Sequence, residues 1–470
     1  MLTIHGYRIP KSANEATLKK ALVVKPFSII NPHAVPRYPV YHEDKQYLYL
    51  PKHFGLERFG EVPSTRDVPQ TDESHWVFEG SIRPAQLPVV NSFLLPQPHD
   101  GIISLHTGGG KTVCALYIAS RLRLPTLVVV HNTFLRDQWE DRIKSFLPKA
   151  RIGRVQAGVC DVADRDVIIV MLQTISMKEL SVDVFKPIGL VIVDECHHIA
   201  SEVFVQSLPK MTSKYMLGLS ATPDRKDKLM FAIHWFLGPL LYKSDTGDSV
   251  DTAVNVEVFE YVNNDDAFNE IVMSSNGYVS VPIMVNKLAD CEDRTRWLCG
   301  IIEDVTEEGR QVLVLSDRVQ HCKDILAGLS DGLREDACIL SQNVKSNQRT
   351  EFCGSKKILI ATYSMCKEGF DVPTLNTLVM ATPRPDIDQI VGRILRVEKK
   401  SRKIHPLIVD IVDPQFRRQF GQRNTLYKKR NYTVTKMALD SAPSVPQRVS
   451  PWEQEDSVAQ AVDSPAPQAH

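Results

Sequence analysis

Short, wholly apolar runs recur along this chain, and amphipathic stretches separate them. In the first half the runs are Ile102–Leu105, Leu127–Val130, Val167–Leu172, Leu190–Val193 and Tyr215–Leu219. Between the second and third runs, apolar residues recur every four positions up to Pro148, which predicts a helix: Leu135, Trp139, Ile143 and Leu147. Apolar strands that alternate with helices are typical of a parallel sheet covered by helices on both faces.

A second series of the same kind follows a less regular stretch near 240–295. Its apolar runs are Val312–Leu315, Ile358–Ala361, Thr377–Met380 and Leu407–Ile411, with helices expected near 317–329 and 386–396. The sequence therefore predicts two α/β domains in tandem, at residues 76–242 and 243–430. Residues 1–75 are irregular and rich in proline, which indicates a small N-terminal accessory region. Residues 431–470 are rich in Pro, Ser, Ala and Gln near their end, and we expect a disordered C-terminal tail.

The composition limits the compartment and the kinds of binding surface that we expect for this protein. Its 470 residues hold 56 Lys+Arg and 56 Asp+Glu, so any nucleic-acid surface must be local. No run approaches the ~20 apolar residues that a membrane helix needs, and the N-terminus lacks the apolar segment of a secretory signal. The nine cysteines are scattered without a CxxC pair, which indicates reduced thiols. We therefore expect an intracellular protein that is neither secreted nor bound to a membrane.

A glycine-rich segment lies directly after the first apolar run and before a helical pattern. It reads Thr107, Gly108, Gly109, Gly110, Lys111 and Thr112. Consecutive glycines let backbone N–H groups surround phosphate oxygens, and the following helix N-terminus favours negative charge. Lys111 can then reach the β- and γ-phosphates of ATP, and Thr112 can bind Mg²⁺. The strict phosphate-binding pattern has glycine where this chain has Leu105, so a glycine-rich turn that binds nothing is the alternative.

Two carboxylates follow the buried run Leu190–Val193. Asp194 would hold Mg²⁺ through water, and Glu195 would orient and deprotonate the water that attacks the γ-phosphate. The C-terminal edge of a parallel sheet is where ligands bind in such folds. One alternative is an acidic helix start. Another is a zinc site formed by Cys196, His197 and His198, although three adjacent residues do not easily converge on one ion.

Four further segments carry polar residues at strand ends, at helix starts or in turns. Arg83 to Gln86 precede the glycine-rich segment, and Ser220 to Thr222 follow the run Tyr215–Leu219. Gln389, Arg393 and Arg396 are spaced to share one helix face, which suits arginines that stabilise transition-state charge; a solvated basic face is the alternative. Gly369 to Pro373 form a turn after the strand that ends at Thr362, and this places Asp371 toward the other domain.

In this order the segments resemble the motifs of superfamily 2 helicases and translocases, over about residues 80–425. The matching segments are RPAQ (83–86), TGGGKT (107–112), DECH (194–197), SAT (220–222), VLVLSDR (312–318), GFDVP (369–373) and QIVGRILR (389–396). The resemblance implies two RecA-like domains with ATP in the cleft between them and nucleic acid across both. Members of the family tolerate residues other than glycine at the position of Leu105.

The family's functional residues carry over to matching positions of this chain. The resemblance implies ATP contacts at Arg83, Gln86, Thr107, Gly108, Gly109, Gly110, Lys111, Thr112, Gly369, Asp371 and Gln389. Catalysis would depend on Lys111, Asp194, Glu195, Arg393 and Arg396, with Mg²⁺ at Thr112 and, through water, at Asp194. His197, Ser220 and Thr222 would couple hydrolysis to movement, and Thr174 and Thr362 would donate hydroxyl groups to the nucleic-acid backbone.

The subgroup is indicated by RPAQ, by HNTFLRDQW (131–139) and by PVYHEDKQYLYLPKHFG (39–55). These resemble XPB-type repair helicases, phage UvsW-type enzymes and the transcript-release helicases of large DNA viruses. The likeness implies a DNA-directed monomer in the cytoplasm, the nucleus, or a viral factory or virion, with transcription or replication proteins as partners.

Between residues 393 and 430 there are twelve Lys/Arg against three acidic residues, which fits phosphate contacts or a solubilising face. The alternatives are a duplex DNA translocase without net unwinding, an RNA helicase, and a non-catalytic ATP-dependent scaffold.

Overall fold

The computed structural model describes residues 1–437 apart from short gaps: 12–14, 26–35, 65–67, 107, 157, 178–179, 181–183, 199–202, 204–206, 222–228, 245–253, 276, 342–343, 345, 368–371, 373, 396 and 398–401. The chain divides into two compact units, Met1–Ser249 and Val250–His470. The sequence-derived boundary at 242/243 stays a prediction, since the chain between the last strand of the first unit and the first strand of the second includes residues outside the described part.

The first unit is built on an eight-stranded sheet in the order β10-β9-β11-β8-β12-β13-β7-β14. Its strands are β7 (Gly101–Ser104), β8 (Thr126–Val130), β9 (Ile152–Gln156), β10 (Val159–Cys160), β11 (Val167–Met171), β12 (Leu190–Val193), β13 (Tyr215–Ser220) and β14 (Leu240–Lys243). All neighbouring strands are parallel except β9 and β10, which form an antiparallel pair. The five apolar runs of the first half are therefore neighbouring strands of one sheet, as predicted.

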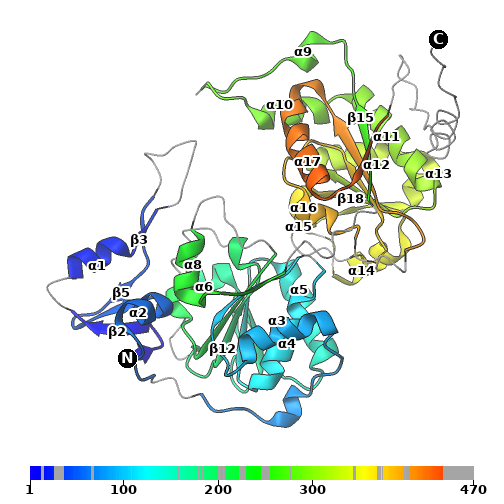
Figure 1. Ribbon diagram of the computed structural model, residues 1–470. Coiled ribbons are helices and arrows are strands. Elements are labelled where there is room, and N and C mark those ends of the chain that lie inside the picture. Colours follow the sequence, from blue (N-terminus) through cyan, green and yellow to red (C-terminus); the bar gives the residue numbers. More distant parts are fainter. Residues whose placement is uncertain are drawn as a thin grey trace, which may run out of the picture. The chain divides into compact units, whose positions relative to one another are not determined.

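Helices cover both faces of this sheet (Figure 1). They are α3 (Leu87–Leu94), α4 (Lys111–Leu122), α5 (Thr133–Phe146), α6 (Leu172–Met177) and α8 (Met230–Leu237). Along β8 the side chains alternate between two cores: Leu127 and Val129 pack in the core of α6 and α8, whereas Val128 and Val130 pack in that of α4 and α5. The helix predicted around Trp139 is α5, which Asn132 caps by accepting a hydrogen bond from the N–H of Leu135 at 2.8 Å.

The N-terminal accessory region is a small antiparallel sheet with two helices. The sheet has the order β1-β2-β6-β5, formed by β1 (Leu2–Thr3), β2 (Gly6–Pro10), β6 (Tyr47–Leu50) and β5 (His42–Glu43). Helix α1 (Glu15–Ala21), the short pair β3 (Val23–Val24) and β4 (Tyr38–Pro39), and α2 (Lys52–Phe59) complete it. Its apolar side chains share one core with the first unit, and Phe54 of α2 packs edge-on against Trp235 of α8 with ring centroids 5.0 Å apart.

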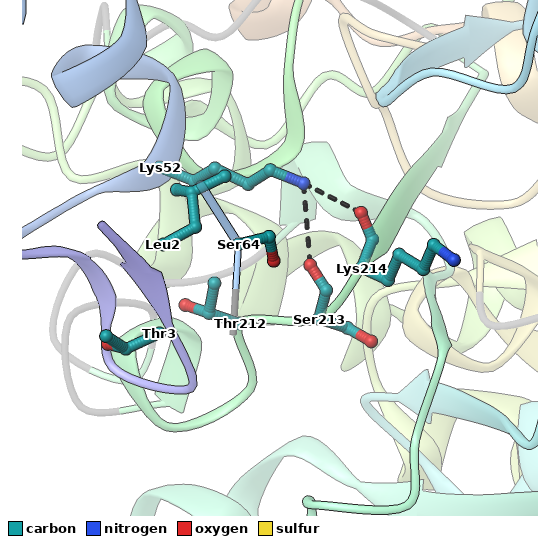
Figure 2. Close-up of a pocket in the computed structure, with 7 residues that line it drawn as sticks. All are labelled: Leu2, Thr3, Lys52, Ser64, Thr212, Ser213 and Lys214. Atoms are coloured by element: carbon teal, nitrogen blue, oxygen red, sulfur yellow. Dashed lines mark hydrogen bonds between the residues drawn. The ribbon is translucent and has the colours of Figure 1, made fainter. Parts of the chain in front are cut away.

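A buried ionic cluster also fixes α2 to the first unit. The Lys52 ammonium group lies 2.7 Å from the Asp100 carboxylate and donates to the carbonyl oxygens of Ser213 and Lys214. Figure 2 shows this lysine beside a small cavity of about 120 Å³, lined by Leu2, Thr3, Lys52, Ser64, Thr212, Ser213 and Lys214. Ligand pockets generally measure about 300–1,000 Å³. The cavity is therefore too small for a nucleotide, and none of the predicted site residues lines it.

The second unit is built on a seven-stranded, wholly parallel sheet in the order β17-β18-β16-β19-β20-β15-β21. Its strands are β15 (Asn255–Glu260), β16 (Val312–Ser316), β17 (Ala337–Leu340), β18 (Ile358–Thr362), β19 (Thr377–Met380), β20 (Leu407–Val412) and β21 (Thr433–Met437). Its helices are α9 (Asp266–Asn269), α10 (Val281–Ala289), α11 (Glu292–Glu307), α12 (Val319–Gly328), α13 (Asp331–Glu335), α14 (Ser346–Ser355), α15 (Tyr363–Lys367), α16 (Asp388–Val391) and α17 (Arg417–Lys429). Two parallel sheets flanked by helices confirm the predicted fold class.

Two predictions for the second half need correction. The helix expected over 386–396 is much shorter, because α16 ends at Val391 and the chain continues in turns through Leu395. The stretch expected to be a tail from residue 431 includes a strand, since β21 pairs with β15. Within the described part of the chain, the search for a helix long and apolar enough to cross a membrane finds none.

Candidate functional site

The glycine-rich loop connects β7 to α4, and two of its glycines have left-handed backbone conformations. Gly108 has a φ of +87° and Gly110 a φ of +84°. A Cβ atom on Gly110 would lie 2.2 Å from Gln86 Nε2 and 3.2 Å from an Arg83 guanidinium nitrogen, so the absence of a side chain lets these two residues approach. The loop leads into the N-terminus of the twelve-residue helix α4, where backbone N–H groups favour an anion. Thr107 lies outside the described residues.

Gln86 and Arg83 lie directly against this loop. Gln86 is 4% exposed and donates from Nε2 to the carbonyl oxygen of Gly109 at 3.2 Å. Its Oε1 accepts from the N–H of Arg83 at 3.0 Å, within a short 3-10 turn, Pro84–Gln86, at the start of α3. The structure thus brings Arg83 and Gln86, predicted to contact ATP, next to the glycine-rich segment predicted to hold its phosphates.

The carboxylate of Asp194 lies at the end of β12 and is held from two directions. The Trp139 indole N–H donates to Oδ2 at 2.8 Å, and the N–H of Glu195 donates to Oδ1 at 2.9 Å. Trp139 is 1% exposed and comes from α5. The helical spacing identified Trp139 as a core residue and missed its polar contact, because a periodic pattern shows which face is buried and not where an indole N–H points.

Lys111 and Glu195 form an ion pair at the same sheet edge. Lys111 Nζ lies 2.9 Å from Glu195 Oε1, and both side chains are largely shielded from solvent. Glu195 has a φ of +46°, an uncommon conformation for a residue other than glycine. Backbone strain of this kind clusters at functional sites. The loop lysine and the two acidic residues, predicted separately, are therefore neighbours in space.

Burial raises the pKa of Asp194 to about 6, and the neighbouring Glu195 carboxylate acts in the same direction. The Lys111 ammonium group and the Trp139 hydrogen bond oppose this shift. A buried, partly compensated carboxylate and a hydroxyl at the start of α4 are oxygen donors that fit Mg²⁺, which prefers oxygen ligands and keeps much of its water. Asp194 and Thr112 are the residues of this chain that would hold such an ion, and the ion's charge would favour the ionised carboxylate.

A histidine connects the acidic strand end to the neighbouring strand. His197 Nδ1 hydrogen-bonds with Ser220 Oγ at 2.9 Å and lies 3.4 Å from Glu195 Oε2. Ser220 ends β13 and is fully buried, whereas Thr222 lies outside the described residues. The zinc alternative for Cys196 to His198 receives no support, because the described residues contain no cluster of three His, Cys, Asp or Glu side chains arranged to hold a metal.

The remaining predicted residues are less well connected. Thr174 lies half-buried on α6, and Thr362 ends β18 with its hydroxyl 2.9 Å from that of Ser364. Gln389 is half-buried on α16, and Arg393 is 7% exposed in the turns that follow it. Hydrogen bonds from Arg393 N to Ile390 O and from Ile394 N to Val391 O span three residues, so the α-helix that carries Gln389 does not continue through Arg393. Arg396, Gly369 and Asp371 lie outside the described residues.

Comparisons with known proteins agree with this geometry. The family model "Type III restriction enzyme, res subunit" matches residues 79–225, which include the glycine-rich loop and the acidic strand end. Over 97% of this chain and 90% of its own length, the mimivirus protein "Putative ATP-dependent RNA helicase L396" (Acanthamoeba polyphaga mimivirus) is 29% identical. The QP509L protein of an African swine fever virus isolate is 26% identical over 78% of this chain and 76% of its own length.

These comparisons support a superfamily 2 helicase of the viral type. The fold is also similar to that of the solved structure of Saccharomyces cerevisiae Dbp5 bound to RNA and ADP BeF3, at a TM-score of 0.54 and 14% identity, over 81% of this chain and 93% of that one. The similarity to the mimivirus protein extends over nearly the whole chain, and the two helix-flanked sheets are consistent with tandem RecA-like domains. Members of the superfamily are ATP-hydrolysing enzymes.

Proposed function

We propose that this chain hydrolyses ATP and uses the cycle to step along nucleic acid as a helicase or translocase. The observation that carries the proposal is the meeting of Lys111 with Glu195 at 2.9 Å, beside a glycine-rich loop and the Asp194 carboxylate. A phosphate-binding lysine, a metal-binding carboxylate and a base must act on the same phosphate. A scaffold that binds nothing at this edge has no need of a strained Glu195 or a buried Asp194.

Each side chain has a separate part in the proposed reaction. Lys111 and the loop N–H groups bind the phosphates, and Gln86 and Arg83, which lie against the loop, contact the base. Glu195 orients the attacking water and accepts its proton. When bound, Mg²⁺ supplies charge that stabilises the leaving and transferring phosphates, and Thr112 and Asp194 are the residues that would hold it. His197 and Ser220 connect this centre to β13, which fits a coupling role.

Arg393 and Arg396 are proposed to add positive charge to the transition state. Arginines in this role are worth about 10³–10⁵ in turnover. The proposal rests on their place in the segment that resembles the family's sixth motif, and Arg393→Ala with intact nucleotide binding and normal turnover would remove it. Gly369, Asp371, Gln389, Thr107 and Thr222 keep their proposed roles on the same ground.

DNA is the proposed polymer, because RPAQ and HNTFLRDQW resemble segments of DNA-directed members. Thr174 and Thr362 are proposed to contact its backbone, which predicts little sequence preference. RNA is the second candidate, and the mimivirus relative's name as an RNA helicase favours it. A duplex translocase without net unwinding uses the same ATP chemistry and is a third possibility to be tested alongside.

The test is the ATPase rate without polymer and with single-stranded DNA, duplex DNA or RNA. We expect stimulation by at least one polymer, largest with DNA. The matched control is Glu195→Gln, which should still bind nucleotide while turnover falls about 10²–10⁴-fold through loss of the base. Equal rates in Glu195→Gln and wild type would refute the assignment of the base. Strand-separation and triplex-displacement assays then distinguish a helicase from a duplex translocase.

A further inference from the structure

The accessory sheet separates its side chains into two chemically different faces. Opposed pairs Tyr7 with Leu50 and Ile9 with Leu48 face the apolar core, whereas Arg8 opposes Tyr49 and Pro10 opposes Tyr47 on the other face. Helix α2 packs on the inner side, where a Cβ on Gly55 would come within 2.2 Å of the Tyr7 ring. The alternation along β2 and β6 therefore sends aromatic and basic side chains outward.

The outward side chains make two sets of contacts, centred on Tyr47 and Tyr49 of β6. The Arg8 guanidinium lies 4.5 Å from the centre of the Tyr47 ring. His5, in the turn between β1 and β2, has its ring centre 5.4 Å from that of Tyr49 and 5.8 Å from that of His42. The rings of His42 and Tyr49 are 5.9 Å apart. We call Arg8, His5, His42, Tyr47 and Tyr49 the aromatic face; four are half-buried and His42 is exposed.

Hydrogen bonds hold part of this face in place. The Tyr49 hydroxyl donates to Asp44 Oδ2 at 2.8 Å, while Asp44 Oδ1 accepts from the N–H groups of Gln46 and Tyr47 at 2.7 Å each. Asp44 is thus engaged in the turn between β5 and β6, and these bonds hold its pKa below its usual range. A ring fixed in advance loses little conformational freedom when a flat ligand stacks on it.

The charge around this sheet differs from that of the chain as a whole. Residues 1–50 contain seven Lys/Arg against three Asp/Glu, although the two classes are equal over the full sequence. Two of the three acids are engaged by lysines: Glu15 pairs with Lys19, and Glu43 with Lys11 and Lys19. Lys20 and Lys45 are exposed. The surroundings therefore attract a polyanion rather than a basic or neutral partner.

We propose that the aromatic face of the accessory sheet binds single-stranded nucleic acid, as a second contact outside the two tandem domains. Bases would stack on Tyr47, Tyr49 and the histidine rings, and nearby lysines would attract the phosphates. Aromatic rings with interspersed cations suit every base, since each base has a flat face, and such binding shows little sequence preference. The inference rests on the proposed function for its polymer, because a strand bound by the motor would be present at a raised local concentration for a second site on the same chain.

The experiment measures binding of fluorescein-labelled dT20 and U20 by anisotropy to the full-length chain without ATP. Base–aromatic stacking corresponds to about fivefold to a hundredfold in affinity per base. We therefore expect Tyr47→Ala/Tyr49→Ala to weaken binding at least fivefold. Tyr47→Phe/Tyr49→Phe keeps both rings and should bind within about twofold of wild type. Tyr278→Ala removes an exposed tyrosine from the second unit and should leave affinity unchanged.

Two further measurements keep the outcome interpretable. The basal ATPase rate without polymer should be the same in all variants, which shows that the fold and the nucleotide site are intact. Photocrosslinking of 5-bromodeoxyuridine oligonucleotides to the wild-type chain should label the aromatic face, an outcome that does not depend on any substitution. Unchanged affinity in the alanine variant, or crosslinks confined to the tandem domains, overturns the proposal; a protein ligand for this face is then the remaining reading. Absence of ATPase activity and of polymer binding in wild type is a different result and refutes the proposed function.

Discussion

At the scale of single residues, Trp139 shows how a core side chain can also set the chemistry of a site. Its ring fills the core between α5 and the sheet, and its N–H is donated to Asp194 Oδ2. Removing the hydrogen-bond partner of a buried polar group costs more free energy than an average hydrogen bond contributes to stability. The loss is larger when the buried group is charged. Two N–H groups of the described residues donate to the Asp194 carboxylate, one to each oxygen, so removing one leaves one oxygen without its donor.

We predict that Trp139→Phe lowers ATP turnover about tenfold to a hundredfold, since a hydrogen bond to a charged group is worth about 1.5–3 kcal/mol. The matched control is Ile143→Val, one turn further along the same buried face of α5, which trims packing and removes no donor. It should cost about 0.5–1.5 kcal/mol of stability and leave turnover unchanged. ATPase rates and thermal unfolding of both variants provide the check. Equal turnover in Trp139→Phe and wild type would show that the indole is a core group alone.

His321 gives a prediction on the pH dependence of stability. It is fully buried on α12, with Nδ1 bonded to Ser316 Oγ at 3.0 Å and Nε2 without a hydrogen-bond partner among the described residues. Burial lowers the pKa of His321 to about 3, and the Arg294 guanidinium adds to the shift. Between pH 6.5 and 3 the unfolded chain therefore takes up a proton that the folded chain does not, so stability falls as the pH decreases.

Integrated from neutral pH to pH 5, this difference in proton uptake lowers the free energy of unfolding by about 2 kcal/mol. We predict that His321→Gln reduces the loss of stability between pH 7.5 and pH 5 by about that amount. Urea denaturation at the two pH values, for wild type and variant, measures it. A variant that is less stable at both pH values by the same amount would mean that His321 takes up its proton equally in the folded and unfolded chains and that its contribution to stability is packing alone.

At the scale of elements, the sequence indicates strands well where both faces are buried. The residues of β8, β11, β12, β16 and β19 are all buried, and each was evident as an apolar run. Strands β15 and β21 were missed: β15 alternates Val256 and Val258 with polar residues, and β21 is a mostly exposed edge strand of threonine, valine and lysine. Tertiary pairing fixes such strands, and local composition does not.

The same distinction explains the helix that proved shorter than expected. Gln389, Arg393 and Arg396 have helical spacing, yet Gly392 follows α16 and the backbone tightens into turns there. Glycine is a poor helix former, so a spacing argument needs the intervening residues as well. By contrast, the glycine-rich loop and the acidic strand end were located correctly, because each is flanked by a fully buried strand that fixes where it emerges.

At the scale of the whole molecule, charge is balanced overall and unbalanced locally. Residues 1–50 carry seven Lys/Arg against three acids, and residues 393–430 carry twelve against three. In the second stretch, Arg423 forms a buried ion pair with Asp410, with N–O distances of 2.8–3.1 Å, so its charge does not face solvent. Arg417, Arg418, Lys428 and Lys429 of the same helix are exposed. A polyanion that binds this protein should therefore depend on a subset of its basic residues.

The salt dependence of the binding affinity shows how many basic residues contact phosphates. Each phosphate neutralised on a single strand contributes about −0.7 to the slope of log affinity against log salt, so five contacts give about −3.5. We predict that Lys428→Ser/Lys429→Ser makes the slope less negative by about 1.4, as expected when two phosphate contacts are lost. Lys149→Ser/Lys323→Ser removes two exposed lysines outside both stretches and should leave the slope unchanged. The measurement is oligonucleotide anisotropy between 50 and ~200 mM salt.

A wild-type affinity that does not change with salt would exclude phosphate contacts as the main source of affinity. Equal slopes in both double variants would assign the exposed lysines of α17 a solubilising role and place the phosphate contacts elsewhere.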